Sequence, residues 1–275
     1  MKVGVFQFNP VFGEVEHNIG LIEKGLAGCQ ADLIVLPELC ATGYQFISTD
    51  EVAGLAEEIP GGPTTRAMIN LATSLQCHLV FGLAERDGDR IYNSAAVVGP
   101  QGFVTKYRKV HLFNEEKIWF SPSDSGFRTF NLNGLTIGLM ICFDWFFPES
   151  ARTLALMGSH IICHPANLVL PFCPEGMKVR CLENKIFAIT ANRIGREERG
   201  GKAPFTYIGR SQVVSPSSEV LIRLAGDETA FAAVEIDPHL AENKSLNVHN
   251  HLFQDSRPAC YRLTCLVPVV AFPVI

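Results

Sequence analysis

Short apolar runs that alternate with segments of helical period constrain the fold of this chain more than any other feature. Several runs, such as residues 33–36, are apolar on both alternations, which is typical of strands covered on both faces. The order is strand–helix–strand–helix, then a hairpin region, then strand–helix–strand–helix again. This order predicts a layered α/β architecture.

The apolar runs and the periodic segments give a set of expected elements. Expected strands cover residues 3–8, 32–36, 78–84, 91–98, 103–107, 135–142, 160–164, 187–191, 211–214 and 231–235. Expected helices cover residues 18–29, 64–75, 148–157 and 177–185. No linker rich in Pro, Gly or Ser separates these elements, so we expect one domain over residues 1–264. An apolar tail follows at residues 265–275, and we have no physical account of its role.

Composition excludes several classes of protein. The chain has 275 residues, of which 47% are hydrophobic and 19% charged, as in a compact globular protein. A net charge of -5 without a basic stripe argues against nucleic-acid binding. No segment approaches the roughly 20 apolar residues that cross a bilayer, so no membrane contact is expected. Nine cysteines without a secretory signal predict reduced thiols in a cytoplasmic protein.

Three polar residues stand at the ends of apolar runs, where α/β sheets usually carry their functional groups. Glu38 follows Pro37 after a strand, and Lys109 ends a basic segment. Cys142 precedes a turn and a helix that begins at Pro148, as in a nucleophile elbow. Each residue also has a plainer interpretation: a loop glutamate, a solvated lysine and a buried structural cysteine.

The segments around these three residues resemble the nitrilase superfamily of carbon–nitrogen hydrolases. They read Pro-Glu at 37–38, Lys-Val-His-Leu-Phe at 109–113 and Cys-Phe-Asp-Trp-Phe-Phe-Pro-Glu at 142–149. They match the family pattern in order and in approximate spacing. Residues 164–167, 180–184 and 209–211 match as well, so the resemblance covers nearly the whole chain.

The resemblance implies a four-layer α–β–β–α sandwich whose two mostly parallel or mixed sheets face each other. It implies that Cys142 is the nucleophile, Glu38 the proton-transfer group and Lys109 the cation that stabilises the oxyanion. The family also has a second glutamate shortly after the lysine; Glu115 and Glu116 are both candidates, and the family spacing favours Glu116. No cofactor and no metal are expected.

The residue types suggest a mechanism. A free thiol is largely protonated near neutral pH, so Glu38 is expected to accept the proton of Cys142 before the sulfur attacks a carbonyl carbon. Lys109 and the backbone N–H of Phe143 then stabilise the negative oxygen. Ammonia leaves, and water hydrolyses the thioester to a carboxylic acid.

Aromatic and polar residues near the motif ends are candidates for the substrate pocket, with core packing as the alternative. These are Tyr44, Phe113, Trp145 and Asn167. Relatives that take carbamoyl amino acids usually carry basic residues or histidines where this chain has aromatic residues 145–147, which favours a small amide. Arg193 could still bind a substrate carboxylate. True nitrilases usually have Trp-Glu after the cysteine, where this chain has Phe-Asp, and this favours amidase over nitrilase activity.

Other functions remain open from the sequence. The same chemistry serves small aliphatic nitriles and dinitriles. A Cys–His enzyme using His111 or His164, a metal hydrolase using His249 and His251, and a catalytically silent binding protein are further alternatives. The resemblance also implies a homodimer or larger homo-oligomer, formed through helices 148–157 and 177–185 and the segment after His239.

Overall fold

The computed structural model describes residues 1–261 and divides the chain into two units. The first unit is Met1–Asn243, and it contains both sheets and the predicted site. The second begins at Lys244, and its described part includes one 3-10 turn, η3 (Pro258–Cys260). The predicted domain end at residue 264 and the tail at 265–275 lie outside the described residues. No helix of the described chain is long and apolar enough to cross a membrane.

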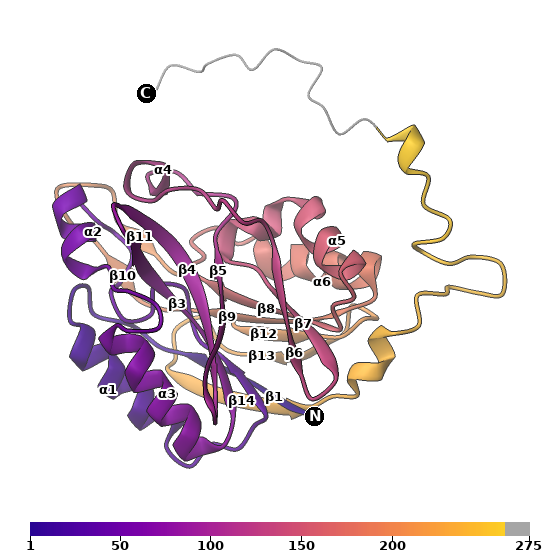
Figure 1. Ribbon diagram of the computed structural model, residues 1–275, viewed down its shortest axis with the longest axis horizontal. Helices are drawn as coiled ribbons and strands as arrows, with labels where there is room; N and C mark the ends of the chain where they lie inside the picture. The colour runs from indigo at the N-terminus through magenta and orange to yellow at the C-terminus, as the bar shows by residue number, and fades with distance from the viewer. Residues whose placement is uncertain (262–275) are drawn as a thin grey trace. The chain divides into compact units, whose positions relative to one another are not determined.

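The first sheet has six strands in the order β14-β1-β2-β3-β4-β5. Its strands are β1 (Lys2–Gln7), β2 (Leu33–Val35), β3 (His78–Asp87), β4 (Arg90–Gly99), β5 (Gly102–Arg108) and β14 (Ala230–Glu235). β1, β2 and β3 are parallel, and the remaining pairs are antiparallel. Helices α1 (Val15–Leu26) and α3 (Pro63–Leu75) cover its outer face, and their apolar sides pack on the strands (Figure 1).

The second sheet also has six strands, in the order β13-β12-β9-β8-β7-β6. Its strands are β6 (Arg128–Leu132), β7 (Leu135–Leu139), β8 (Ile161–Ala166), β9 (Phe187–Asn192), β12 (Gln212–Val214) and β13 (Val220–Arg223). β7, β8 and β9 are parallel. Helices α5 (Pro148–Leu156) and α6 (Cys173–Asn184) pack on this sheet and on each other (Figure 1).

The two sheets face each other, with β1 and β2 lying against β8 and β9. A buried polar contact also joins them, because the Ser211 hydroxyl and backbone N–H both donate to Gln7 Oε1 of β1. The predicted four-layer α–β–β–α sandwich is therefore confirmed, and both of its sheets are mixed.

Several predicted elements differ from the structure. The strand expected over 135–142 ends at Leu139, because the N–H of Ile141 donates to Asp144 Oδ2 at 2.9 Å and Cys142 begins a 3-10 helix, η1 (Cys142–Phe146). The sequence pattern does not predict β6, β13, the short helices α2 (Thr49–Leu55) and α4 (Glu116–Trp119), or the hairpin of β10 (Arg196–Glu197) and β11 (Phe205–Thr206). These elements are short or only partly buried, so their hydrophobic patterns are weak.

Strand direction decides where the polar residues meet. β5 runs parallel to β2, since two antiparallel pairings separate it from β3, and the ends of both strands therefore point to one edge of the sheet. Glu38 follows β2 and Lys109 follows β5 at that edge. In the second sheet Cys142, Asn167 and Arg193 follow the parallel strands β7, β8 and β9.

Candidate active site

Glu38 reaches the site because its backbone crosses β3 at a glycine. Gly82 N–H donates to the carbonyl of Pro37 at 3.1 Å, and Cys40 N–H donates to the carbonyl of Gly82 at 3.0 Å. A Cβ at Gly82 would lie 2.5 Å from Glu38 Cα and 2.7 Å from Leu39 N. Only glycine leaves room for this crossing, which carries Glu38 from the end of β2 toward β4.

The Glu38 carboxylate is fully buried, and one of its oxygens accepts two hydrogen bonds. Lys109 Nζ and Asn93 Nδ2 each lie 2.7 Å from Oε1, while Oε2 has no hydrogen-bond partner. Burial raises the pKa of Glu38 to about 7; Lys109 opposes this shift, and the charge of Glu116 adds to it. A carboxyl group with this pKa can both accept and return a proton near neutral pH.

Lys109 lies between two carboxylates. Its Nζ donates to Glu116 Oε1 at 2.8 Å as well as to Glu38. Burial alone would lower the pKa of Lys109, but Glu116 and Glu38 outweigh that effect and raise it, so the ammonium stays charged. Glu116 also accepts from the Tyr44 hydroxyl at 2.6 Å. Glu115 instead pairs with Lys202 at 2.7 Å, so Glu116 is the glutamate that contacts the lysine.

Cys142 occupies a strained turn at the start of η1. Its backbone φ is +37°, a value that residues other than glycine rarely adopt. The next N–H, of Phe143, belongs to the first turn of the helix, where backbone donors have no acceptor within the helix. Burial and the nearby charge of Glu38 raise the pKa of the Cys142 thiol, while Lys109 and the backbone amide of Asn167 oppose this, so the resting sulfur is protonated.

The two histidines of the Cys–His alternative are engaged elsewhere. His164 Nε2 lies 2.9 Å from the backbone oxygen of Cys142, and its Nδ1 lies 3.1 Å from Thr190 Oγ1. Burial lowers the pKa of His164 to about 4, so the ring is neutral and supports the turn. His111 Nδ1 lies 2.8 Å from Asp144 Oδ1. In none of these contacts does an imidazole nitrogen bond to the sulfur of Cys142.

Asp144 joins the segment that carries the lysine to the segment that carries the thiol. Its Oδ2 accepts from the Tyr107 hydroxyl at 2.7 Å and from the N–H of Ile141. Its Oδ1 accepts from the N–H of His111 at 3.0 Å and faces the His111 ring. Because Tyr107 and His111 flank Lys109, one buried carboxylate fixes the lysine segment and the cysteine segment relative to each other.

A small cavity opens beside Cys142, with a volume of about 50 Å³, which admits only a small ligand. Its lining is almost entirely apolar and consists of Phe113, Cys142, Phe143, Trp145, Phe146, Asn167, Leu168, Val169 and Leu170. Trp145 packs closely on Gly176 of α6. Of the predicted pocket residues, Phe113, Trp145 and Asn167 line this cavity. Tyr44 does not, and its hydroxyl donates to Glu116 instead.

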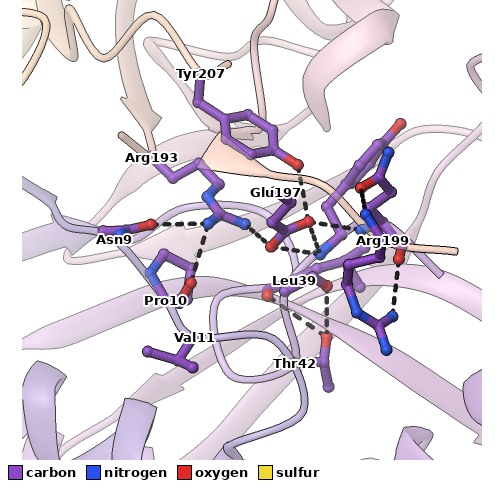
Figure 2. A network of polar contacts seen from close by, with 12 residues as sticks. Asn9, Pro10, Val11, Leu39, Thr42, Arg193, Glu197, Arg199 and Tyr207 are labelled. Atoms are coloured by element: carbon purple, nitrogen blue, oxygen red, sulfur yellow. Dashed lines mark hydrogen bonds and ion pairs between the residues drawn. The ribbon is translucent and has the colours of Figure 1, made fainter. Parts of the chain in front are cut away.

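Arg193 is fully buried in a polar network of protein groups. Its guanidinium bonds to Glu197, Asn9 and Pro10, as Figure 2 shows. Protein groups therefore occupy the guanidinium, which leaves it unavailable to a ligand. Glu197 in turn accepts from the N–H of Tyr44 at 3.1 Å, so the network supports the residue that holds Glu116.

Three residues of the site, Asn93, Asp144 and Glu197, are not predicted from the sequence. Asn93 could have been found, since it interrupts an otherwise apolar strand. Asp144 lies within the recognised cysteine motif, yet nothing in the sequence reveals its four donors. Glu197 falls in a segment expected to be a loop. It accepts from the distant N–H of Tyr44 as well as from the nearby Arg193.

Known proteins are similar to this chain in sequence. A carbon–nitrogen hydrolase family model matches residues 2–244. Over 264 residues the chain is 48% identical to a nitrilase from Pyrococcus abyssi (strain GE5 / Orsay), covering 95% of this chain and 99% of that protein. Over 242 residues it is 31% identical to an (R)-stereoselective amidase from Pseudomonas sp, and the match covers 86% of this chain and 85% of that protein.

The fold is also that of a solved enzyme. The crystal structure of an amidase from Nesterenkonia sp. superposes with a TM-score of 0.74 at 24% identity, covering 88% of this chain and 92% of that one. A related structure of that amidase is described as belonging to the nitrilase superfamily. Since the family model spans both sheets and all the motif segments, the chain belongs to the carbon–nitrogen hydrolase family of the nitrilase superfamily, as the resemblance predicted.

Proposed function

We propose that this carbon–nitrogen hydrolase cleaves small amides to a carboxylic acid and ammonia, through a thioester on Cys142. The observation that carries the proposal is the buried cluster of Glu38, Lys109 and Glu116 next to a thiol that lines a small apolar cavity. Such a cluster supplies the base, the cation and the nucleophile that amide hydrolysis needs.

The first half of the reaction forms the thioester. Glu38 accepts the thiol proton through its unpartnered Oε2 as Cys142 Sγ attacks the carbonyl carbon. Lys109 Nζ and the N–H of Phe143 stabilise the negative oxygen, and one such donor contributes about 3–4 kcal/mol. Glu38 then returns the proton to the leaving nitrogen, the carbon–nitrogen bond breaks and ammonia departs.

The second half regenerates the enzyme. Glu38, again ionised, accepts a proton from water as the water oxygen attacks the thioester carbon. The same donors stabilise the second negative oxygen. The carbon–sulfur bond breaks, the sulfur regains the proton from Glu38, and the carboxylic acid leaves.

The cavity supports an amide with a short aliphatic acyl group. Its walls are apolar, and Arg193 is engaged within the protein, so a carboxylate on the acyl chain would lack a cation. Simple aliphatic amides are therefore favoured over the ω-amide of a dicarboxylic acid. The second candidate is hydrolysis of small nitriles, because the relative at 48% identity is named a nitrilase.

An ammonia-release screen tests the proposal. Propionamide, butyramide, succinamic acid and propionitrile are incubated with the wild-type protein and with Cys142→Ala. We expect release from the two aliphatic amides with the wild-type protein and none with the variant. Turnover that survives in Cys142→Ala contradicts the nucleophile, and release from propionitrile alone makes the nitrilase the better assignment.

We also propose that the chain forms a homodimer. Helices α5 and α6 pack together and carry exposed apolar side chains, which a monomer would leave in water. They are Leu156, Met157, Val179 and Leu182.

A further inference from the structure

Among the residues that line the cavity beside Cys142, Asn167 has the one carboxamide side chain. Asn167 follows β8, is only 4% exposed, and both its Oδ1 and its Nδ2 lack a hydrogen-bond partner. An unpaired buried amide is unfavourable for the fold, so a complete pair of unpaired atoms in a cavity suggests that a ligand satisfies them.

Asn192 provides a contrast within the same sheet. It ends β9 directly beside the end of β8, in register with Ala166. Its Oδ1 accepts from the N–H of Leu168 at 2.7 Å, and its Nδ2 donates to the carbonyl of Gly209 at 2.7 Å. The fold therefore pairs both ends of a structural asparagine here, whereas its neighbour Asn167 lines the cavity with neither of its buried amide atoms paired.

An unpaired donor together with an unpaired acceptor requires a ligand that offers both. A primary carboxamide offers an N–H and a carbonyl oxygen in one plane, and that oxygen has a second lone pair for Lys109. A nitrile offers only an acceptor, so Asn167 Oδ1 would stay unpaired. Sites with buried polar groups reject ligands that leave those groups unsatisfied.

We propose that Asn167 is the residue that selects primary carboxamides with small apolar acyl groups over nitriles. Its Oδ1 accepts an N–H of the substrate amide, and its Nδ2 donates to the substrate oxygen. This inference rests on the proposed function, because it assumes that the reacting carbon sits at Cys142.

Kinetics on a matched pair of substrates tests the selection. Asn167→Leu keeps the number and branching of the side-chain heavy atoms and removes both polar atoms. We expect kcat/KM for propionamide to fall about 10- to 100-fold, while kcat/KM for propionitrile changes less than about threefold. Leu170→Ala alters the same cavity wall without polar atoms and should shift both substrates alike. An equal change of both substrates in Asn167→Leu, or no change, overturns the proposal.

Binding and stability give readouts that do not depend on turnover. In the Cys142→Ala background, calorimetry should detect propionamide binding that Asn167→Leu weakens about 10-fold or more. The melting temperature of Asn167→Leu should rise by about 2–4 °C, because an uncompensated amide is removed. A purely structural asparagine would instead lower it.

These outcomes separate the two proposals. A wild-type protein that hydrolyses neither substrate contradicts the proposed function, while amide binding lost in Asn167→Leu still supports the selection. Propionamide binding that is absent, or that Asn167→Leu leaves unchanged, overturns the selection even where amide turnover is established.

Discussion

A single cation between two buried carboxylates dominates the electrostatics of the site at the scale of residues. Lys109 donates to Glu38 and to Glu116, and the side chains of all three are at most 3% exposed. Removing Lys109 would leave two buried carboxylates without their cation, which is far more costly than losing a surface ion pair. The site is therefore expected to respond strongly to small changes.

The pH profile should report the ionisation of Glu38. Its pKa is raised to about 7 by burial, and only the ionised form can accept the thiol proton. Below pH 7 the carboxyl is mostly protonated, so kcat/KM should fall as pH falls through about 7 and level off above it. Initial rates of ammonia release from pH 5 to 9 measure this. An acid limb near pH 4.5 would contradict the raised value.

Glu38→Gln should lower kcat by about 100- to 10,000-fold at every pH, because the amide cannot accept the thiol proton. Circular dichroism should show an intact fold, since glutamine keeps the shape of the side chain. A variant that retains both its rate and its acid limb would place the base elsewhere.

Tyr44→Phe should lower kcat about tenfold by removing the hydroxyl that donates to Glu116 at 2.6 Å. Hydrogen bonds to charged groups are among the stronger ones, and Glu116 would be less firmly held on Lys109. Tyr92→Phe is the control, because its hydroxyl contacts Asp124 at 3.4 Å outside the cluster. Equal losses in the two variants would show a general effect of removing a hydroxyl.

The residues that sequence analysis could predict are those at strand ends. Glu38 and Lys109 interrupt or end apolar runs, and strand direction then brings them together. The positive φ of Cys142 and the four donors around Asp144 depend on tertiary contacts that no local pattern records. The same holds for Glu197, which accepts from the backbone N–H of Tyr44, 153 residues away.

At the scale of elements, adding a single methyl group at Gly82 tests whether the crossing of the Glu38 segment over β3 positions the carboxylate. Gly82→Ala would place a Cβ 2.5 Å from the Glu38 Cα and push the carboxylate from its position. We expect a loss of about 1–3 kcal/mol in stability and about 100-fold in kcat. Gly20→Ala is the matched control, because Gly20 is an exposed position of α1, nothing lies within 4 Å of a Cβ placed there, and alanine favours helices.

Thermal melting measures the stability of Gly82→Ala and Gly20→Ala, and ammonia release measures their kcat. Gly20→Ala should keep full activity and gain up to about 1 kcal/mol in stability. Full activity in Gly82→Ala would mean that the Glu38 segment adapts, and that β3 does not set the position of the carboxylate.

The connection between the lysine segment and η1 depends on Asp144. Asp144→Asn leaves a single acceptor oxygen for donors from Ile141, Tyr107 and His111. Unpaired buried donors should reduce the free energy of unfolding by about 2–4 kcal/mol and disturb the oxyanion donors. Urea unfolding and kcat measure both effects. Asp124→Asn, at an exposed carboxylate, is the control and should change neither clearly.

At the scale of the whole molecule, the helices that cover the second sheet, α5 and α6, form the interface of the proposed homodimer. Leu156 is 62% exposed and Val179 is 52% exposed, on helices that pack side by side (Figure 1). A stable dimer needs roughly 800 Å² from each partner, and an apolar helix face is suited to the centre of such an interface. We therefore expect this face to be covered by a second copy.

The double variant Val179→Glu/Leu182→Glu should convert the dimer to a monomer, because burying two carboxylates opposite their own copies is strongly unfavourable. Light scattering coupled to gel filtration measures the mass. Val104→Glu, at an exposed position of edge strand β5, should leave the mass unchanged. A wild-type chain that elutes as a monomer, or a double variant that keeps the dimer mass, would exclude this face as the interface. Because η1 contacts both α5 and α6, loss of the dimer should also lower kcat.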